Sequence, residues 1–201
     1  MSDAAKNNLR LANALDRRAA MRRLLDGRGN LLLVTGLGST TYDAAAVGDD
    51  DRNFYLWGAM GAAAIVGLGL AIARPDRRVL VVTGDGDMLM GLGSLATIGV
   101  ERPPNLAIVV FDNGRYAETG MQPSHTDGGV SLCGVARACG IEAVYDIADE
   151  NGLGEFAGRL HNFDGTIFAR VAIRADEQMR VLPSRDGVFL KNRFRRALGA
   201  E

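Results

Sequence analysis

A carboxylate and an amide follow two apolar runs of this sequence, at positions where they could bind one cation. Asp85 lies between two glycines after residues 79–83, and Asn113 follows residues 106–111. Carboxylate and amide oxygens suit Mg²⁺, which also takes phosphate oxygens as ligands. Flanking glycines let a ligand approach the backbone, and a helix that begins there offers free N–H groups to a phosphate. The pattern therefore indicates a phosphate group bound through a cation.

Two other phosphate-binding patterns do not fit. A dinucleotide-binding turn needs Gly-x-Gly-x-x-Gly, and Leu89 stands where the third glycine belongs. A P-loop needs Gly-Lys followed by Ser or Thr, and the sequence has no such triplet. Taken alone, the Gly-Asp-Gly segment is equally well explained as a tight strand-to-helix turn, and Asn113 as a buried polar residue. The interval between Asp85 and Asn113 fits one helix and a neighbouring strand, which favours a shared site.

The elements that position these loops alternate between strands and helices. Strands are expected at residues 31–35, 79–83, 106–111, 142–145 and 167–173. Most of these runs are continuously apolar, as in strands buried on both faces of a parallel sheet. Helical patterns occur at about residues 4–26, 59–74, 88–100, 128–139, 150–162 and 187–198. The alternation predicts an α/β fold, a doubly wound, mostly parallel sheet with helices on both faces, which binds ligands at the carboxyl ends of its strands.

Composition narrows the class of protein further. Of the 201 residues, 47% are hydrophobic and 23% are charged, which is enough apolar material for a folded core. A formal net charge of −1 gives no electrostatic case for binding nucleic acid. Two cysteines suit a reducing compartment, and neither a secretory signal nor a membrane span is apparent. We expect one cytoplasmic domain over 1–201, with an N-terminal helix in 1–28 and a basic C-terminal helix in 187–201.

Together the two loops resemble a known cofactor signature. The Gly-Asp-Gly turn at 84–86, a spacer and the pair Asp112-Asn113 look like the motif of thiamine diphosphate enzymes, which usually have Asn at the first position of that pair. Residues 53–63 resemble the segment that grips the cofactor's aminopyrimidine. The resemblance, over roughly residues 10–175, is to the β-type subunit of sulfopyruvate decarboxylase and the C-terminal half of phosphonopyruvate decarboxylase.

The resemblance implies which residues hold thiamine diphosphate and Mg²⁺. Asp85 and Asn113 would bind the metal through their side chains, and Arg115 through its backbone carbonyl. Gly86 and Asp87 would present N–H groups to the diphosphate. Further cofactor contacts are expected from Gly36, Ser39, Gly84, Tyr116 and Ala117.

Four more residues receive candidate roles from the resemblance. The Gly58 carbonyl would accept a hydrogen bond from the cofactor's 4′-amino group, and Met60 would be the wedge that bends the cofactor, so that its imino nitrogen reaches the thiazolium C2–H. A core methionine is the other interpretation of Met60. His125, whose imidazole titrates near neutral pH, and Glu118 are candidate catalytic residues. A surface histidine and a carboxylate that only bonds the backbone are the alternatives.

The resemblance also implies a partner. Enzymes of this family activate the aminopyrimidine with a glutamate on a separate pyrimidine-binding domain, for which this chain has no room. We therefore expect an α-type pyrimidine-binding subunit that supplies the glutamate, in a hetero-oligomer of the α2β2 type or larger. A homo-oligomer that uses a glutamate of this chain is the alternative.

The expected function is that of the cofactor-binding subunit of a non-oxidative decarboxylase, which converts a small 2-oxo acid into an aldehyde and CO2. Two alternatives remain: a carboligase or 2-oxo acid oxidoreductase subunit on the same cofactor, and a non-catalytic subunit that keeps the fold. The decarboxylases that the chain resembles have Ser-Arg-Glu-Leu in the first loop, where this chain has Ser39-Thr40-Thr41-Tyr42. Because the arginine of that loop is absent here, the resemblance does not decide whether the substrate carries a sulfonate or phosphonate group.

Overall fold

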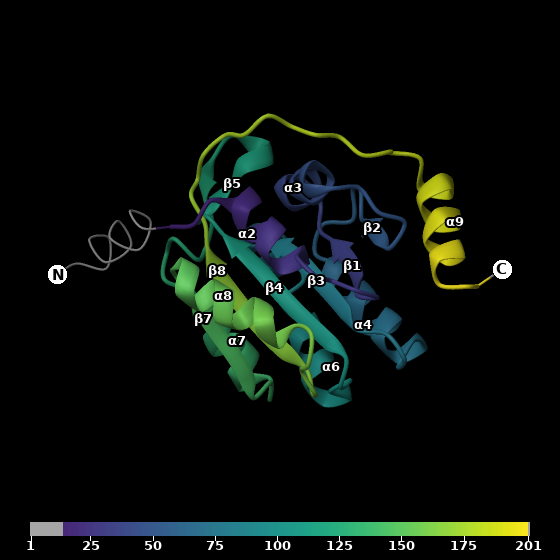
Figure 1. The fold of residues 1–201 in the computed structure, drawn as a ribbon. Coiled ribbons are helices and arrows are strands. Elements are labelled where there is room, and N and C mark those ends of the chain that lie inside the picture. The colour runs from purple at the N-terminus through teal and green to yellow at the C-terminus, as the bar shows by residue number, and fades with distance from the viewer. Residues whose placement is uncertain (1–13, 201) are drawn as a thin grey trace.

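One parallel sheet lies at the centre of the molecule. The computed structural model describes residues 14–200, and its main sheet has the order β2-β1-β3-β4-β8-β7 with every neighbouring pair parallel (Figure 1). A small antiparallel pair, β5 with β6, lies outside this sheet. The strands are β1 (Leu32–Thr35), β2 (Asn53–Tyr55), β3 (Val79–Gly84), β4 (Leu106–Asp112), β5 (Arg115–Tyr116), β6 (Gln122–Pro123), β7 (Ala143–Ile147) and β8 (Ile167–Ala172).

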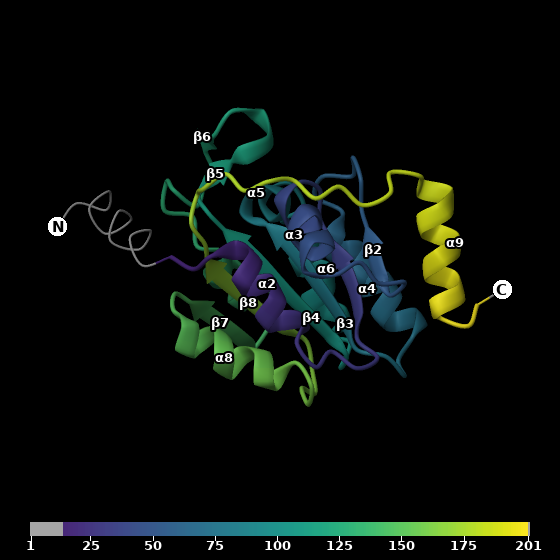
Figure 2. The ribbon, with the colours of Figure 1, turned by 45° about the horizontal axis from the view of Figure 1, so that its top comes forward.

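Helices cover both faces of the sheet. One face carries α2 (Arg17–Leu25), α3 (Ser39–Val47) and α8 (Glu150–Arg159) (Figure 2). The other face carries α4 (Ala63–Ala73), α5 (Asp85–Met90), α6 (Ser94–Glu101) and α7 (Leu132–Ala138). The last helix, α9 (Gly187–Ala197), packs against β2, and a 3-10 turn, η1 (Ala117–Thr119), follows β5. This is the doubly wound α/β fold that the sequence predicts. No helix within residues 14–200 is long and apolar enough to span a bilayer.

The core forms because the strands carry apolar side chains on both faces. Leu32 and Val34 of β1 join the cluster under α4 and α6, whereas Leu33 between them joins the cluster under α2 and α8. Every residue of β1, β4 and β8 is buried. The burial of apolar surface, worth roughly 25 cal/mol per Å², therefore stabilises the sheet from both sides and keeps the strand ends in fixed positions.

The sheet has its topological switch point between β1 and β3. From β1 the chain passes to β2 on one side, and it then returns to β3 on the other side of β1. The loops that leave β1 and β3 therefore run to opposite faces, which opens a crevice at the carboxyl edge of the sheet. Open α/β sheets bind their ligands at such a point.

Several local features differ from the sequence-based expectation. Within the described residues the helix expected at 4–26 begins only at Arg17, because Leu15 pairs with Ile173 beside the sheet. The helix expected at 59–74 begins only at Ala63, because Gly58 and Gly61 have positive φ angles of 68° and 87°, which a right-handed helix excludes. The helix expected at 88–100 is two helices, α5 and α6, separated at Gly91. β2 and α3 lack a sequence signal, since β2 is three residues long and α3 buries Thr, Tyr and Asp side chains. The expected N-terminal helix before residue 14 lies outside the described residues.

Two glycines of α4 should respond oppositely to substitution by alanine. A Cβ on Gly67 would lie 2.2 Å from Val81 Cγ2 in the core, whereas a Cβ on Gly69 would meet nothing within 4 Å. Gly67→Ala should therefore lower the free energy of unfolding by about 1–3 kcal/mol. Gly69→Ala should raise it by up to about 1 kcal/mol, because alanine is the better helix former. Urea denaturation of both variants tests this, and equal effects would contradict the packing of α4 on β3.

Candidate functional site

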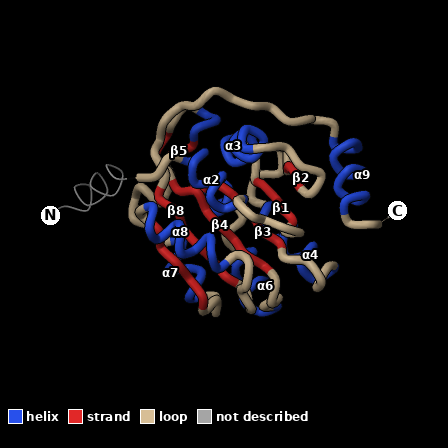
Figure 3. Tube along the Cα trace, in the orientation of Figure 1, coloured by secondary structure: helices blue, strands red, loops and turns tan. Residues whose placement is uncertain are grey.

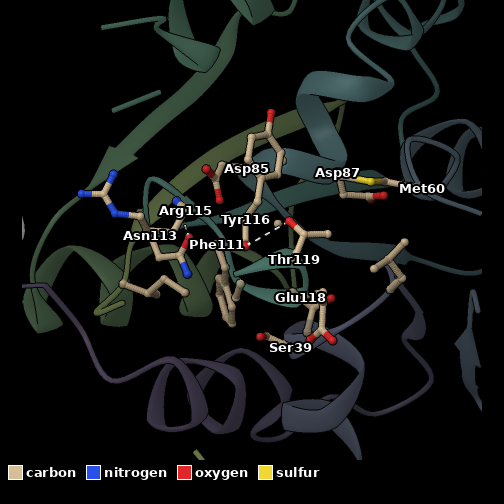
Figure 4. Close-up of a pocket in the computed structure, with 16 residues that line it drawn as sticks. Ser39, Met60, Asp85, Asp87, Phe111, Asn113, Arg115, Tyr116, Glu118 and Thr119 are labelled. Carbon is tan, nitrogen blue, oxygen red and sulfur yellow. Dashed lines mark hydrogen bonds between the residues drawn. The ribbon is translucent and has the colours of Figure 1, made fainter. Parts of the chain in front are cut away.

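A pocket opens at the switch point, and most of its lining comes from the three loops that leave β1, β3 and β4 (Figure 4). It measures about 150 Å³. Its lining consists of Leu37, Ser39, Thr40, Met60, Gly84, Asp85, Gly86, Asp87, Phe111, Asn113, Arg115, Tyr116, Ala117, Glu118, Thr119 and Ile173. The sequence motifs on separate loops are thus brought to one place.

Asp85 is the buried acid of this pocket. It is the first residue of α5 and is only 2% exposed. Its Oδ2 accepts hydrogen bonds from Ser124 Oγ and, at 3.2 Å, from Thr126 Oγ1. Burial raises the pKa of Asp85 to about 6, with a further contribution from the charge of Asp112, although the two hydroxyl donors act in the opposite direction. Keeping this carboxylate ionised therefore costs free energy.

Asp112 differs from Asp85 because a cation compensates its charge. Its Oδ2 accepts a hydrogen bond at 2.6 Å from Nε of Arg170, a buried arginine of β8. Its Oδ1 lies 2.8 Å from Thr126 Oγ1, so the two carboxylates share the single proton of this hydroxyl. Within residues 14–200 no lysine or arginine forms an ion pair with Asp85. Asp85 is thus the carboxylate that a cation would stabilise.

Asn113 and Arg115 line the same pocket and carry further oxygen atoms of the kind that such a cation accepts. Asn113 is 7% exposed, and its Oδ1 accepts the Arg115 N–H at 2.9 Å, which leaves the oxygen a second lone pair. The Arg115 guanidinium pairs with Asp127 at 2.5 Å. No group of three or more His, Cys, Asp or Glu residues in the described chain could hold a metal. A carboxylate, an amide and a carbonyl form the mixed donor set that Mg²⁺ accepts.

Asp87 connects two sides of the pocket. Its Oδ1 accepts the Gly61 N–H at 2.6 Å, and its Oδ2 accepts the hydroxyl of Thr83. These bonds fix the segment that precedes α4 against the start of α5. Met60 therefore lies in the pocket lining with 38% of its surface exposed, and the core interpretation of this methionine does not hold.

Two glycines in the loops around the pocket, Gly36 and Gly86, leave no room for a side chain. A Cβ on Gly86 would lie 2.5 Å from the Tyr116 ring, so this ring packs directly on the start of α5. A Cβ on Gly36 would lie 2.6 Å from Thr83 Oγ1 and 2.7 Å from the Asp87 carboxylate. Glycine at both positions thus lets the three loops approach one another closely.

The two candidate catalytic residues occupy different positions. Glu118 lines the pocket, and its carboxylate lies 3.6 Å from the guanidinium of Arg180. Burial raises the pKa of the Tyr42 phenol, and the charge of Glu118 raises it further.

His125 is exposed and outside the lining, with its Nδ1 3.4 Å from the Tyr116 hydroxyl. Gly36 and Gly58 also lie outside the lining.

Sequence reasoning missed three residues that shape the site. Ser124 and Thr126 flank His125 in a segment that belongs to the resemblance, and their hydroxyls bond Asp85, but the sequence predicts a role only for the histidine. Arg170 is a charged residue within an apolar strand run, which is a signal for a buried ionic partner.

Comparison with protein-family models places the chain near a known domain. Residues 37–169 match the C-terminal TPP binding domain of the thiamine pyrophosphate enzymes. The matched range contains the loops after β3 and β4 and all but Gly36 of the loop after β1, and it ends within β8.

Curated relatives agree with this match. The chain is 35% identical over 170 residues to sulfopyruvate decarboxylase subunit beta of Methanocaldococcus jannaschii. The aligned region covers 83% of this chain and 88% of that subunit. It is 41% identical over 157 residues to phosphonopyruvate decarboxylase of Streptomyces viridochromogenes, covering 78% of this chain but 39% of that protein. The chain thus spans most of the length of the first relative and about two fifths of the second.

A solved structure supports the fold. Benzoylformate decarboxylase from Polynucleobacter necessarius superimposes with a TM-score of 0.65 and 17% sequence identity, over 82% of this chain and 34% of that one. At this identity the likeness concerns the fold alone.

Because the pKa of Asp85 is raised, the free energy of unfolding of the metal-free protein should fall as the pH rises. The folded state holds this proton up to pH about 6, whereas the unfolded chain releases it near the ordinary value of 3.8. Stability is therefore lost as the pH rises through this interval, by on the order of 3 kcal/mol at neutral pH. In EDTA, Asp85→Asn should be more stable than the wild type at pH 7 and equal to it near pH 3.5, as measured by urea denaturation.

The matched control is Asp164→Asn, which removes an exposed carboxylate from the turn before β8, at the opposite edge of the sheet. Its stability difference from the wild type should not grow between the two pH values. A constant difference for Asp85→Asn would contradict the buried, uncompensated carboxylate.

Proposed function

This chain belongs to the thiamine pyrophosphate enzymes, and we propose that it is the cofactor-binding subunit of a decarboxylase that converts a small 2-oxo acid into an aldehyde and CO2. The observation that carries the proposal is Asp85, a buried carboxylate without an ionic partner within residues 14–200, at the switch point and at the start of α5. A cation at this carboxylate would hold a diphosphate against the helix N-terminus.

The donors of the pocket suit Mg²⁺ and thiamine diphosphate. We assign the metal to the side chains of Asp85 and Asn113 and the carbonyl of Arg115, and the diphosphate to the N–H groups of Gly86 and Asp87. Support comes from the buried oxygens of Asp85 and Asn113 and from the position of Gly86 and Asp87 in the pocket lining. When bound, thiamine diphosphate supplies the thiazolium that adds to the 2-oxo group and takes up the electrons released with CO2.

The chain's own residues would shape and orient the cofactor. Met60 would contact the cofactor from the opposite side of the pocket. The hydrogen bond from the Gly61 N–H to Asp87 fixes the segment that carries Met60. The exposed position of Met60 supports a ligand contact. Glu118 would face the substrate from η1, and His125 would act from the rim beside Tyr116.

We further propose that an α-type pyrimidine-binding subunit completes the site, in a hetero-oligomer. The relative from M. jannaschii is named a beta subunit, and the chain covers only 39% of phosphonopyruvate decarboxylase. The pocket of about 150 Å³ is also smaller than the ~300–1,000 Å³ usual for small-molecule sites.

Exposed apolar side chains beside the pocket fit such a partner. Met60, Ile65 and Met90 are 38%, 38% and 68% exposed. They belong to segments that touch at Gly61 and Gly91, where a Cβ on Gly91 would lie 1.9 Å from the Gly61 carbonyl. Contiguous exposed apolar surface is typical of protein interfaces.

An oxidoreductase on the same cofactor is less well supported, because it must pass electrons to an acceptor. The chain has two cysteines, fewer than the four that bind an iron–sulfur cluster. A carboligase would need the same cofactor site but joins the reaction intermediate to a second substrate. Detection of a free aldehyde therefore separates a decarboxylase from a carboligase.

Coexpression with a pyrimidine-domain partner tests the proposal. The purified complex, with thiamine diphosphate and Mg²⁺, should release CO2 and an aldehyde from a 2-oxo acid such as 3-sulfopyruvate, and either chain alone should not. Asp85→Ala should lower kcat/KM by about 100-fold or more, since metal ions contribute several kcal/mol to such sites. Asp76→Ala, at the far edge of the sheet, should leave the rate unchanged.

Three outcomes would contradict parts of this proposal. Full activity of the isolated chain would support a homo-oligomer instead of a partner. Consumption of the 2-oxo acid with a coupled product and no free aldehyde would indicate a carboligase. Cofactor binding by the complex without any turnover would indicate a non-catalytic subunit.

A further inference from the structure

An irregular segment crosses the molecule between β8 and α9. This crossing segment, residues 174–186, contains neither helix nor strand and passes over α3 (Figure 3). Three backbone hydrogen bonds hold it in place: the Arg174 N–H donates to the Leu15 carbonyl at 2.9 Å, the Met179 carbonyl accepts from Arg18 at 2.9 Å, and the Ser184 carbonyl accepts from the Trp57 indole at 2.9 Å. The segment lies beyond residues 37–169, the range of the family match.

The crossing segment brings Arg180 to the edge of the pocket. The Arg180 guanidinium lies 3.6 Å from the carboxylate of Glu118, which lines the pocket together with Ser39 and Thr40. It also lies over the ring of Tyr42, 5.6 Å from the ring centre. Its side chain is nevertheless 61% exposed. The guanidinium is therefore oriented by two groups and still open to solvent.

Arg180 differs from the other arginines near the pocket in how its charge is used. Arg115 pairs with Asp127 at 2.5 Å. Arg17 is buried, pairs with Asp43 at 3.2 Å and donates to Ser39 Oγ at 2.8 Å. The pair of Arg180 with Glu118 is looser. An incoming anion can replace Glu118 beside Arg180 at a lower cost in free energy, because both side chains are already partly solvated.

The pocket needs such a cation if its ligand carries a second negative charge. Asp85, Asp87 and Glu118 all line it, and the α3 loop contributes the hydroxyls of Ser39 and Thr40 rather than a positive charge. Arginine suits sulfonate and phosphonate groups, because its planar N–H groups can bond two oxygens of a tetrahedral anion at once.

We propose that Arg180 determines substrate specificity by binding the second anionic group, of the sulfonate or phosphonate class, of a 2-oxo acid. Glu118 holds the guanidinium in place in the empty pocket, and the anionic group of the substrate replaces it on binding. The Tyr42 ring lies against the Arg180 guanidinium both with and without bound substrate. This assignment deepens the proposed function and rests on it for the 2-oxo group.

Binding of a substrate mimic tests the assignment without catalysis, because all of these groups belong to this chain. Calorimetry should detect 3-sulfopropionate binding to the full chain, and Arg180→Gln should weaken it about tenfold or more, as expected for charge-assisted hydrogen bonds. Glu118→Gln should tighten it, because the competing carboxylate is lost. Propionate, which lacks the sulfonate, should not distinguish Arg180→Gln from the wild type.

Arg185→Gln is the matched control, since Arg185 lies in the same segment with its guanidinium over Trp57, 5.3 Å from the ring centre. It should bind 3-sulfopropionate as the wild type does. Emission from Trp57, the only tryptophan of the chain, should be unchanged in Arg180→Gln if the crossing segment stays in place. No binding by the wild type, or equal affinities of the wild type and Arg180→Gln, would overturn the assignment.

Kinetics of the complex give the second test. Arg180→Gln should raise KM for 3-sulfopyruvate about tenfold with kcat nearly unchanged, and leave KM for pyruvate unchanged. Equal effects on the two substrates would overturn the role of Arg180. A complex that turns over neither substrate would contradict the proposed function instead, and the calorimetry would then decide the anion site by itself.

Discussion

The burial of one carboxylate, Asp85, is the constraint on which the arrangement of the site depends. A buried carboxylate is costly unless it is hydrogen-bonded or paired, and this one has two hydroxyl donors, Ser124 and Thr126, and a raised pKa of about 6. The neighbouring Asp112 would add a second charge, but Arg170 pairs with it at 2.6 Å. The protein thus compensates the charge of Asp112 internally, whereas Asp85 has no ionic partner within residues 14–200.

The sheet and its glycines make that arrangement possible. The buried strands β1, β3 and β4 end side by side, so their loops start from fixed positions. Gly36 and Gly86 then let these loops pack within van der Waals distance, and Asp87 joins the segment of Gly61 to them. The rigid scaffold places donors from distant parts of the sequence at one edge, which is what binding a cofactor by preorganised groups requires.

Much of the fold could be predicted because continuous apolar runs such as residues 106–111 have few other ways to be buried. The short β2 and the polar α3 could not, since tertiary contacts rather than local pattern stabilise them. In the site, motif residues such as Asp85 and Asn113 were identified because their types and spacing match a known cofactor signature. Arg180 was not, because only the path of an irregular segment brings it beside Glu118.

The central claim is that Asp85 binds a cation which in turn holds a diphosphate. Calorimetric titration of thiamine diphosphate into the full chain and into its coexpressed complex, with and without Mg²⁺, tests it most directly. The account predicts binding by the complex that requires Mg²⁺, is lost in Asp85→Ala and is kept in Asp76→Ala. Binding that is independent of Mg²⁺, or that survives Asp85→Ala, would contradict the role of this carboxylate. An absence of binding even in the complex would contradict the cofactor site itself.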